Sequence, residues 1–166
     1  MVVTLPPGGT RGTEIPKFVR PLLKVGTPLS HFMLRRLGDR MKVQGRPLVM
    51  LTTLGAKTGK KREVVVARFD DPGHPGSWLV IGSASGAARH PAWCYNLVQN
   101  PDQVWANVDK QEYEVHAESL HGAEREEAWQ RVVSIAPGFK RYETITDREV
   151  LVIRLTPNAH NSRSSM

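Results

Sequence analysis

The stretch that decides the predicted fold is residues 47–70, PLVMLTTLGAKTGKKREVVVARFD. Its two ends, 47–55 and 62–70, are runs of β-branched and apolar residues, and the glycine-bearing loop AKTGKK connects them. Two such runs with glycine between them predict a β-hairpin with a fairly long loop. The hairpin would bring four cations to one tip, a feature that a fold alone does not require: Lys57, Lys60, Lys61 and Arg62.

The rest of the chain predicts four more strands and two helices. Further strand patterns follow at 78–85, on either side of a turn at 109–110, and at 149–157. Helical patterns occupy 91–100 and 122–136. In the second of these helices four residues are expected on the inner face: Ala128, Trp129, Val132 and Val133.

Strands in consecutive hairpins, with helices inserted at two points, do not match the alternating βαβ pattern of parallel folds. We predict an α+β, mainly β fold: an antiparallel sheet that curls into a small barrel, with helices packed outside. One ordered domain is expected over 27–157, beginning with a helix capped by Thr27. Residues 1–26 predict a flexible basic arm rich in Pro and Gly, and 158–166 a disordered polar tail.

The composition is that of a globular domain. Of the 166 residues 40% are hydrophobic and 23% are charged, and no apolar run is long enough to cross a bilayer. The first residues lack the apolar core of a secretory signal, so a cytoplasmic location is expected. The single cysteine, Cys94, excludes an intramolecular disulfide and any cysteine-based zinc site, and is expected to be a small buried residue.

The positive charge is concentrated in the first part of the chain. Residues 1–62 hold 13 Lys and Arg against two acidic residues, whereas residues 63–166 hold 10 against 14. The net charge of these two parts is therefore +11 and −4, which together give +7. Such asymmetry points to an anionic partner, which leaves nucleic acid, a phosphate-bearing cofactor and an anionic membrane surface open.

The cationic loop has some ingredients of a phosphate-binding loop but not the spacing of a Walker A motif. Its glycines allow backbone amides to turn toward an anion, and Lys57 and Arg62 supply charge-assisted hydrogen bonds. The alternative interpretation is a solvated turn whose lysines keep the protein soluble.

A second loop of small residues, GSASGAARHP (82–91), overlaps the end of the predicted strand 78–85 and enters the first helix at Pro91. Gly82, Ser83 and Ser85 would let a flat or anionic ligand approach the backbone closely. Arg89 and His90 add charge and hydrogen-bonding capacity. An ordinary connection between strand and helix is the alternative.

Catalytic constellations of the common kinds are missing from the sequence. The six histidines show no metal-ligand spacing with carboxylates, so no metal site is expected, and no serine lies in a G-x-S-x-G elbow. Any chemistry is therefore expected to come from a bound cofactor.

Three segments in order resemble a known family: LTTLGAKTGKKRE, then SGAARHPAWCYNLVQNPDQVWANV, then APGFKRYETITDRE. They look like the deazaflavin-dependent nitroreductase and quinone reductase family of actinobacteria, over about residues 47–157. The resemblance implies a split β-barrel of the flavin-reductase type that binds coenzyme F-420. This cofactor is a flat deazaflavin that carries a phosphodiester and an oligoglutamate tail, and so it would explain the cationic loop.

The resemblance also implies roles for particular residues. The phosphate and tail would be held by Lys57, Thr58 and Arg62, with Lys60 and Lys61 as secondary attraction. The deazaflavin would be bordered by Gly82, Ser83, Ser85, Arg89 and His90, with Trp93 and Asn96 behind it. Ala56 stands where some relatives have arginine.

On the substrate side, nitroreducing relatives have several tyrosines after the last helix, whereas this chain has Ala136 and Phe139 there and keeps only Tyr142. Efficient reduction of bulky nitro compounds is therefore not expected. Phe139 and Tyr142 would line the substrate pocket, and the proton donor would be Ser83 or Tyr142.

The leading hypothesis is an F-420-dependent reductase that transfers a hydride to a quinone-like or other hydrophobic acceptor. The alternatives are an FMN-binding split-barrel oxidoreductase, an F-420-binding protein without turnover, and a basic nucleic-acid-binding module. The last is disfavoured because the cations have no interleaved aromatic residues for base stacking. The basic N-terminal segment would suit peripheral contact with the inner face of the cell membrane.

Overall fold

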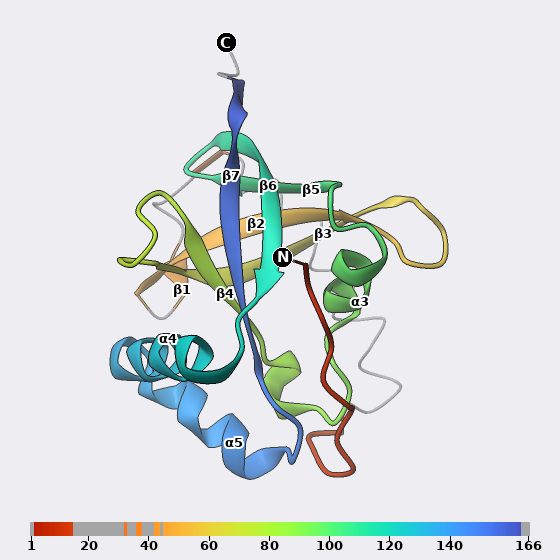
Figure 1. The fold of residues 1–166 in the computed structure, drawn as a ribbon, viewed down its shortest axis with the longest axis vertical. Helices are drawn as coiled ribbons and strands as arrows, with labels where there is room; N and C mark the ends of the chain where they lie inside the picture. The colour runs from red at the N-terminus through yellow and green to blue at the C-terminus, as the bar shows by residue number, and fades with distance from the viewer. Residues whose placement is uncertain (1, 15–31, 33–35, 38–41, 44, 164–166) are drawn as a thin grey trace.

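The computed structural model describes residues 2–14, 32, 36–37, 42–43 and 45–163 (Figure 1). Its strands are β1 (Lys42–Val43), β2 (Arg46–Leu54), β3 (Lys61–Asp70), β4 (Trp78–Gly82), β5 (Val104–Val108), β6 (Gln111–Ser119) and β7 (Leu151–Arg163). The helix predicted to begin at Thr27 lies outside the described residues, apart from positions 32, 36 and 37.

Six of these strands close into an antiparallel barrel. The order in the sheet is β1-β2-β3-β4-β7-β6-β5, and an additional pairing of β2 with β5 joins its two sides. The last strand of the chain, β7, lies between β4 and β6 and completes the ring (Figure 1). The predicted barrel is therefore confirmed.

The β5–β6 hairpin forms where the sequence placed its turn. Asp109 and Lys110 both have a positive φ, of 48° and 70°. Two successive residues with positive φ form the turn that matches the right-handed twist of a hairpin. The strand pairs follow directly, from Val108 opposite Gln111 to Trp105 opposite Glu114.

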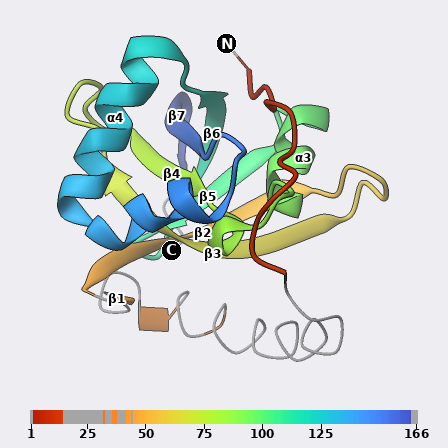
Figure 2. The ribbon, with the colours of Figure 1, turned by 90° about the horizontal axis from the view of Figure 1, so that it is seen from below.

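The helices pack outside the barrel, on two different sides. A short 3-10 turn, η2 (Ala84–Gly86), leads into α3 (Ala92–Gln99) on one side (Figures 1 and 2). The other side carries α4 (Gly122–Ile135), a second 3-10 turn, η3 (Pro137–Arg141), and α5 (Tyr142–Ile145).

Two apolar clusters hold these layers together. The barrel interior is filled from β2, β5, β6 and β7 and is joined by Trp93, Cys94 and Leu97 of α3. The outer faces of β4 and β7 pack against α4, where Trp129 is fully buried. Ala128 and Val132 are buried beside it and Val133 packs against the same cluster, so the predicted inner face of α4 is confirmed.

The two ends of the chain are more ordered than the sequence suggested. Strand β7 continues to Arg163 and pairs with β6, so the disordered tail predicted from Asn158 was wrong for 158–163. Residues 2–14 of the predicted arm lie against the barrel, and Val3 is buried in its core. Backbone pairing at β7 and non-local contacts at the N-terminal end stabilise segments that have no apolar period of their own.

Candidate cofactor-binding site

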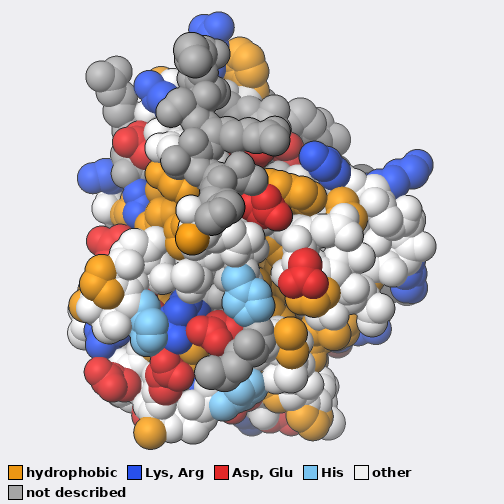
Figure 3. Space-filling model, turned by 45° about the horizontal axis from the view of Figure 1, so that its top comes forward, with side chains coloured by type: hydrophobic (Ala, Val, Ile, Leu, Met, Phe, Trp, Pro, Cys, Tyr) orange, Lys and Arg blue, Asp and Glu red, His pale blue; other side chains and the backbone are white. Residues whose placement is uncertain are grey.

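The loop between β2 and β3 is folded on itself by backbone hydrogen bonds. The Gly55 amide donates to the Lys60 carbonyl at 2.8 Å, and the Thr58 and Gly59 amides donate to the Gly55 carbonyl at 3.2 and 2.8 Å. Gly59 takes a positive φ of 63°, which glycine adopts without a steric penalty. The loop therefore presents a set of exposed side chains: Lys57, Thr58, Lys60, Lys61 and Arg62. Figure 3 shows Lys and Arg side chains projecting at this edge of the molecule.

Helix α3 supports the cationic loop from behind. The buried Asn96 accepts a hydrogen bond from the Ala56 amide at 2.9 Å and donates to Thr53 Oγ1 at 3.0 Å. One turn later, Asn100 donates to the Leu54 carbonyl at 3.2 Å. Asn96 thus positions the cationic loop through the loop's backbone, whereas the resemblance had placed Asn96 behind the deazaflavin.

Two of the loop cations are directed differently from each other. Arg62 pairs across the hairpin with Thr53, and a Cβ built on Gly55 would lie 3.6 Å from Arg62 Nε and 2.7 Å from Thr58 Oγ1. Because Gly55 has no side chain, the side chains of Thr58 and Arg62 can both lie close to its backbone. Lys61 instead places Nζ 4.7 Å from the centre of the Trp105 ring, a cation–π contact on the outer face of the barrel.

The small-residue loop at the end of β4 has an unusual backbone. Ala84, Ser85 and Gly86 have successive positive φ values of 44°, 53° and 77°. Only Gly86 adopts this region without a cost, so the surrounding structure must hold Ala84 and Ser85 in it. Ser83 is half-buried, and Ser85 and Arg89 are exposed.

Three of the residues predicted for this site face inward. A Cβ on Gly82 would lie 3.1 Å from both Cys94 Sγ and Leu151 Cβ, so Gly82 permits close packing of β4 on α3. Trp93 is buried in the barrel core. The His90 ring is buried with Nε2 2.8 Å from the Pro6 carbonyl, which places His90 in the supporting structure of the loop.

Sequence reasoning missed the role of Arg148. This arginine is 5% exposed, and its guanidinium donates to the carbonyls of Ala87 and Ser83 at 2.7 Å each and of Glu149 at 3.2 Å. It lies in a quoted family segment, but an arginine next to two acidic residues is expected to be solvated. The sequence contained no signal that it would be buried under the loop.

Strands β3 and β4 diverge between the two loops. Their pairing covers only Arg68 with Val80, Phe69 with Leu79 and Asp70 with Trp78. Within the described chain, residues 61–67 of β3 pair with β2 alone. The cationic loop precedes the diverging part of β3, and the small-residue loop follows the diverging end of β4. The barrel is thus split between the two sets of predicted cofactor residues.

An aromatic cluster lies next to the small-residue loop. Phe139 makes edge-to-face contacts with Phe69 and Tyr142, at centroid distances of 5.8 and 5.5 Å. A Cβ on Gly86 would be 3.3 Å from Cδ1 of Tyr142, so the tyrosine ring packs directly on the loop. Ala136 is fully buried. The structure therefore brings the predicted substrate residues Phe139 and Tyr142 close to the loop that contains Ser83.

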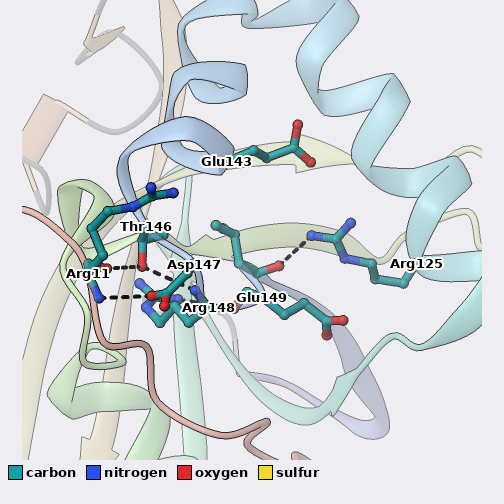
Figure 4. Close-up of a pocket in the computed structure, with 8 residues that line it drawn as sticks. Arg11, Arg125, Glu143, Thr146, Asp147, Arg148 and Glu149 are labelled. Carbon is teal, nitrogen blue, oxygen red and sulfur yellow. Dashed lines mark hydrogen bonds between the residues drawn. The ribbon is translucent and has the colours of Figure 1, made fainter.

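An open pocket of about 270 Å³ lies between α4, α5 and the start of β7 (Figure 4). Its walls mix positive and negative side chains, and Arg125 donates there to the Val150 carbonyl at 2.8 Å. None of the sequence-predicted site residues lines it. The pocket shares Arg148 with the underside of the small-residue loop.

The electrostatics of the loop support neutral forms for two groups. Burial raises the pKa of the Cys94 thiol above its ordinary range, which favours the protonated thiol at neutral pH. Burial is the largest effect on His90 and lowers the pKa of its ring below 6.5. The hydrogen bond to the Pro6 backbone opposes this shift, the positive charge of Arg148 adds to it, and the Pro7 backbone and Glu149 oppose it more weakly. Arg148 Nη1 faces the unprotonated Nδ1 of the ring at 3.4 Å.

His90 makes stability depend on pH. Because its folded pKa is lowered, the unfolded chain binds a proton more readily, and the contribution to stability is complete above about pH 6.5 and is lost as pH falls through 6.5. We expect the wild type to lose more free energy of unfolding between pH 7.5 and pH 5 than His90→Gln, which keeps a donor for Pro6. Urea unfolding at both pH values measures this, and equal losses would contradict the lowered pKa.

Comparisons with known proteins identify the fold and the family. The family model of the F420H(2)-dependent quinone reductases matches residues 31–157. A Mycobacterium tuberculosis protein named as an F420H(2)-dependent quinone reductase is 29% identical over 111 residues, which are 67% of this chain and 90% of that protein.

Two solved structures agree with this match. A solved F420-H2 dependent reductase, FDR-A, is 35% identical with a TM-score of 0.58, over 66% of this chain and 94% of that one. A second structure, described as a domain-swapped dimer, is 30% identical with a TM-score of 0.59, over 81% and 98%. The predicted split-barrel fold, the cofactor F-420 and the reductase activity are confirmed, and nothing favours the FMN, non-turnover or nucleic-acid alternatives. The chain therefore belongs to the F420H(2)-dependent quinone reductase family.

Proposed function

We propose that coenzyme F-420 lies across the split between β3 and β4, with its anionic tail on the cationic loop and its ring against residues 82–90. The observation that supports this most is the divergence of the two strands, in which β3 before Arg68 is not paired with β4 after Val80. Exposed cations lie on one side of this split and a small-residue loop lies on the other. These two surfaces match the two halves of the cofactor, a flat ring and a negatively charged chain.

On the tail side, Lys57, Thr58 and Arg62 hold the phosphodiester and the first carboxylate by charge-assisted and neutral hydrogen bonds. They project from a loop that Asn96 fixes from behind, so little conformational entropy is lost on binding. Lys60 contributes longer-range attraction. Lys61 contributes least, because its ammonium group already contacts the Trp105 ring.

On the ring side, Ser83, Ser85 and Arg89 border the deazaflavin with polar groups that are at least partly exposed. Gly82, His90 and Trp93 support the loop and do not border the ring, since all three are buried. The chain thus fixes the ring through backbone shape more than through charged side chains.

When bound, the reduced deazaflavin supplies a hydride to the acceptor. A quinone that receives a hydride also needs one proton to become the hydroquinone, and Tyr142 or Ser83 is placed to donate it to the acceptor oxygen. Phe139 packs against Tyr142 and offers an apolar face to a flat acceptor. The protein then contributes orientation and proton supply.

The proposed acceptor is quinone-like and hydrophobic. The cluster of Phe69, Phe139 and Tyr142 suits an apolar ring, and Arg46 adds a cation 5.6 Å from the centre of the Phe139 ring. In the described part of the chain no helix is long and apolar enough to cross a membrane. Peripheral contact through the basic N-terminal segment stays a prediction, since residues 15–31 lie outside the described part.

Removal of the proton donor tests the catalytic assignment. We expect Tyr142→Phe to lower kcat for a soluble quinone by about a hundredfold, a usual size for loss of a general acid, with the Kd of F-420 unchanged. Steady-state oxidation of reduced F-420, with Ser83→Ala in parallel, measures this. If only Ser83→Ala slows turnover, the serine is the donor; if neither does, the proton comes from solvent and both assignments fail.

A further inference from the structure

Residues 9–13 of the N-terminal segment, GTRGT, lie along the small-residue loop (Figure 2). The Gly9 amide donates to the Ala88 carbonyl at 2.8 Å, and the Thr13 amide to the Gly86 carbonyl at 2.9 Å. Thr13 Oγ1 also donates to the Ser85 carbonyl at 2.9 Å. We call residues 9–13 the N-terminal strap.

The strap is anchored on both sides of the loop. The Thr10 and Arg11 amides both donate to Asp147 at 2.9 Å, and Thr146 Oγ1 donates to the Arg11 carbonyl at 2.9 Å (Figure 4). Upstream, Thr4 bonds to Ser119 and His121, and Val3 is buried in the barrel core. The segment is therefore tied to the end of β6 and to the connection between α5 and β7, as well as to the loop.

Two glycines permit this close approach. A Cβ on Gly12 would fall within 3 Å of Ala88 N, the Gly86 carbonyl oxygen and the Ala87 carbonyl carbon, all of which are backbone atoms that cannot move independently. A Cβ on Gly9 would fall within 3 Å of Asp147 Oδ1, a side-chain atom, and 3.1 Å from the Arg148 amide nitrogen. Gly8 differs, since its Cβ would lie 3.7 Å from the Ala88 oxygen, an ordinary contact.

Together the strap and Arg148 donate hydrogen bonds to five of the six backbone carbonyls of residues 83–88. Groups of the strap donate hydrogen bonds to the carbonyls of Ser85, Gly86 and Ala88. The Arg148 guanidinium donates to the carbonyls of Ser83 and Ala87. The remaining one, of Ala84, accepts from the Ala87 amide at 3.0 Å. All six carbonyls from 83 to 88 are thus bonded, which explains how Ala84 and Ser85 persist at positive φ.

We infer that the N-terminal strap and Arg148 are positioning elements of the cofactor site, and that they clamp the deazaflavin-binding loop from two sides. This inference rests on the proposed placement of the ring against residues 82–90. A ligand that needs one loop conformation binds with an apparent Kd that rises in inverse proportion to the population of that conformation. Loosening the strap therefore weakens binding of the ring, even though no strap residue needs to touch the cofactor.

The test is a fluorescence titration of F-420 into the full chain and into Gly12→Ala, with Gly8→Ala as the matched control. A second ligand, the same deazaflavin without phosphate and tail, is titrated in parallel. If Gly12→Ala leaves the loop competent about one tenth of the time, the Kd of both ligands rises about tenfold, whereas Gly8→Ala leaves both unchanged. Arg148→Met should resemble Gly12→Ala, with partial rescue in Arg148→Lys.

Equal affinities for Gly12→Ala and Gly8→Ala, in folded protein, would overturn the inference. Should Gly12→Ala not fold, the double variant Thr10→Val, Thr13→Val at two exposed positions carries the same test. Failure of the proposed function looks different: Lys57→Ala with Arg62→Ala would then leave F-420 affinity unchanged, whatever the strap variants do.

Discussion

Replacing Lys57 and Arg62 together with alanine is expected to weaken the binding of coenzyme F-420 by a hundredfold or more. Each charge-assisted hydrogen bond contributes roughly 1.5–3 kcal/mol, and about 1.4 kcal/mol corresponds to a factor of ten. Lys57 lies next to Ala56, whose amide Asn96 holds, and Arg62 lies in the paired part of β3. The loss should therefore reflect the missing charges and not a collapsed loop. Fluorescence titration of the oxidised cofactor measures it.

The same titration with the deazaflavin that lacks phosphate and tail provides the control ligand. The double variant should bind it as the wild type does, because the cationic loop is proposed to contact only the tail. Lys61→Ala is the matched control protein, since Lys61 is engaged with Trp105. An equal loss for both ligands would mean that the variant disturbs the whole site, and no loss for either would remove the loop from the site.

Arg154→Met is expected to reduce the free energy of unfolding by about 3–5 kcal/mol, the usual cost of removing one partner of a buried ion pair. Arg154 is 5% exposed and bonds to Asp71 at 2.6 Å, Glu124 at 2.8 Å and Glu118 at 3.0 Å. Without it, Asp71 would be left buried with only the more distant Arg131 and His74 nearby. The arginine thereby joins β7 to β6, to α4 and to the chain after β3.

Urea unfolding with two companion variants checks this value. Arg131→Met should cost less than about 1 kcal/mol, because its side chain is 29% exposed, its nearer partner Glu127 is solvated, and Asp71 is 3.8 Å away and keeps Arg154. Asp71→Asn added to Arg154→Met should recover part of the loss, since the uncompensated buried charge is then gone. If Arg154→Met lowered the free energy of unfolding no more than Arg131→Met does, the ion pairs of Arg154 would not stabilise the fold.

The parts of this fold that the sequence predicted are those that short-range chemistry determines. The β-branched runs on either side of AKTGKK form β2 and β3, and the Asp109-Lys110 turn forms the next hairpin. The inward face of α4 was also predictable, because apolar residues recur there at helical spacing. In each case neighbouring residues along the chain carry the whole signal.

The parts that were missed depend on contacts between distant residues. The strap bonds to residues more than 70 positions away through the Gly9 and Thr13 amides, which are backbone groups that give no sequence signal, and through the Thr13 hydroxyl. Its glycines suggested a loose loop, whereas they permit close packing. Arg148 and the end of β7 are polar segments for which solvation is the ordinary expectation. Only the assembled barrel shows that Arg148 is buried and that the end of β7 pairs with β6.

The most direct test of the proposed cofactor placement is hydrogen–deuterium exchange of the backbone amides, with and without coenzyme F-420. Protection is predicted in two separate segments at once, residues 55–62 and residues 82–90, because one ligand bridges the split between β3 and β4. Protection confined to one of these segments, or located instead around the open pocket at residues 143–150, would contradict that placement.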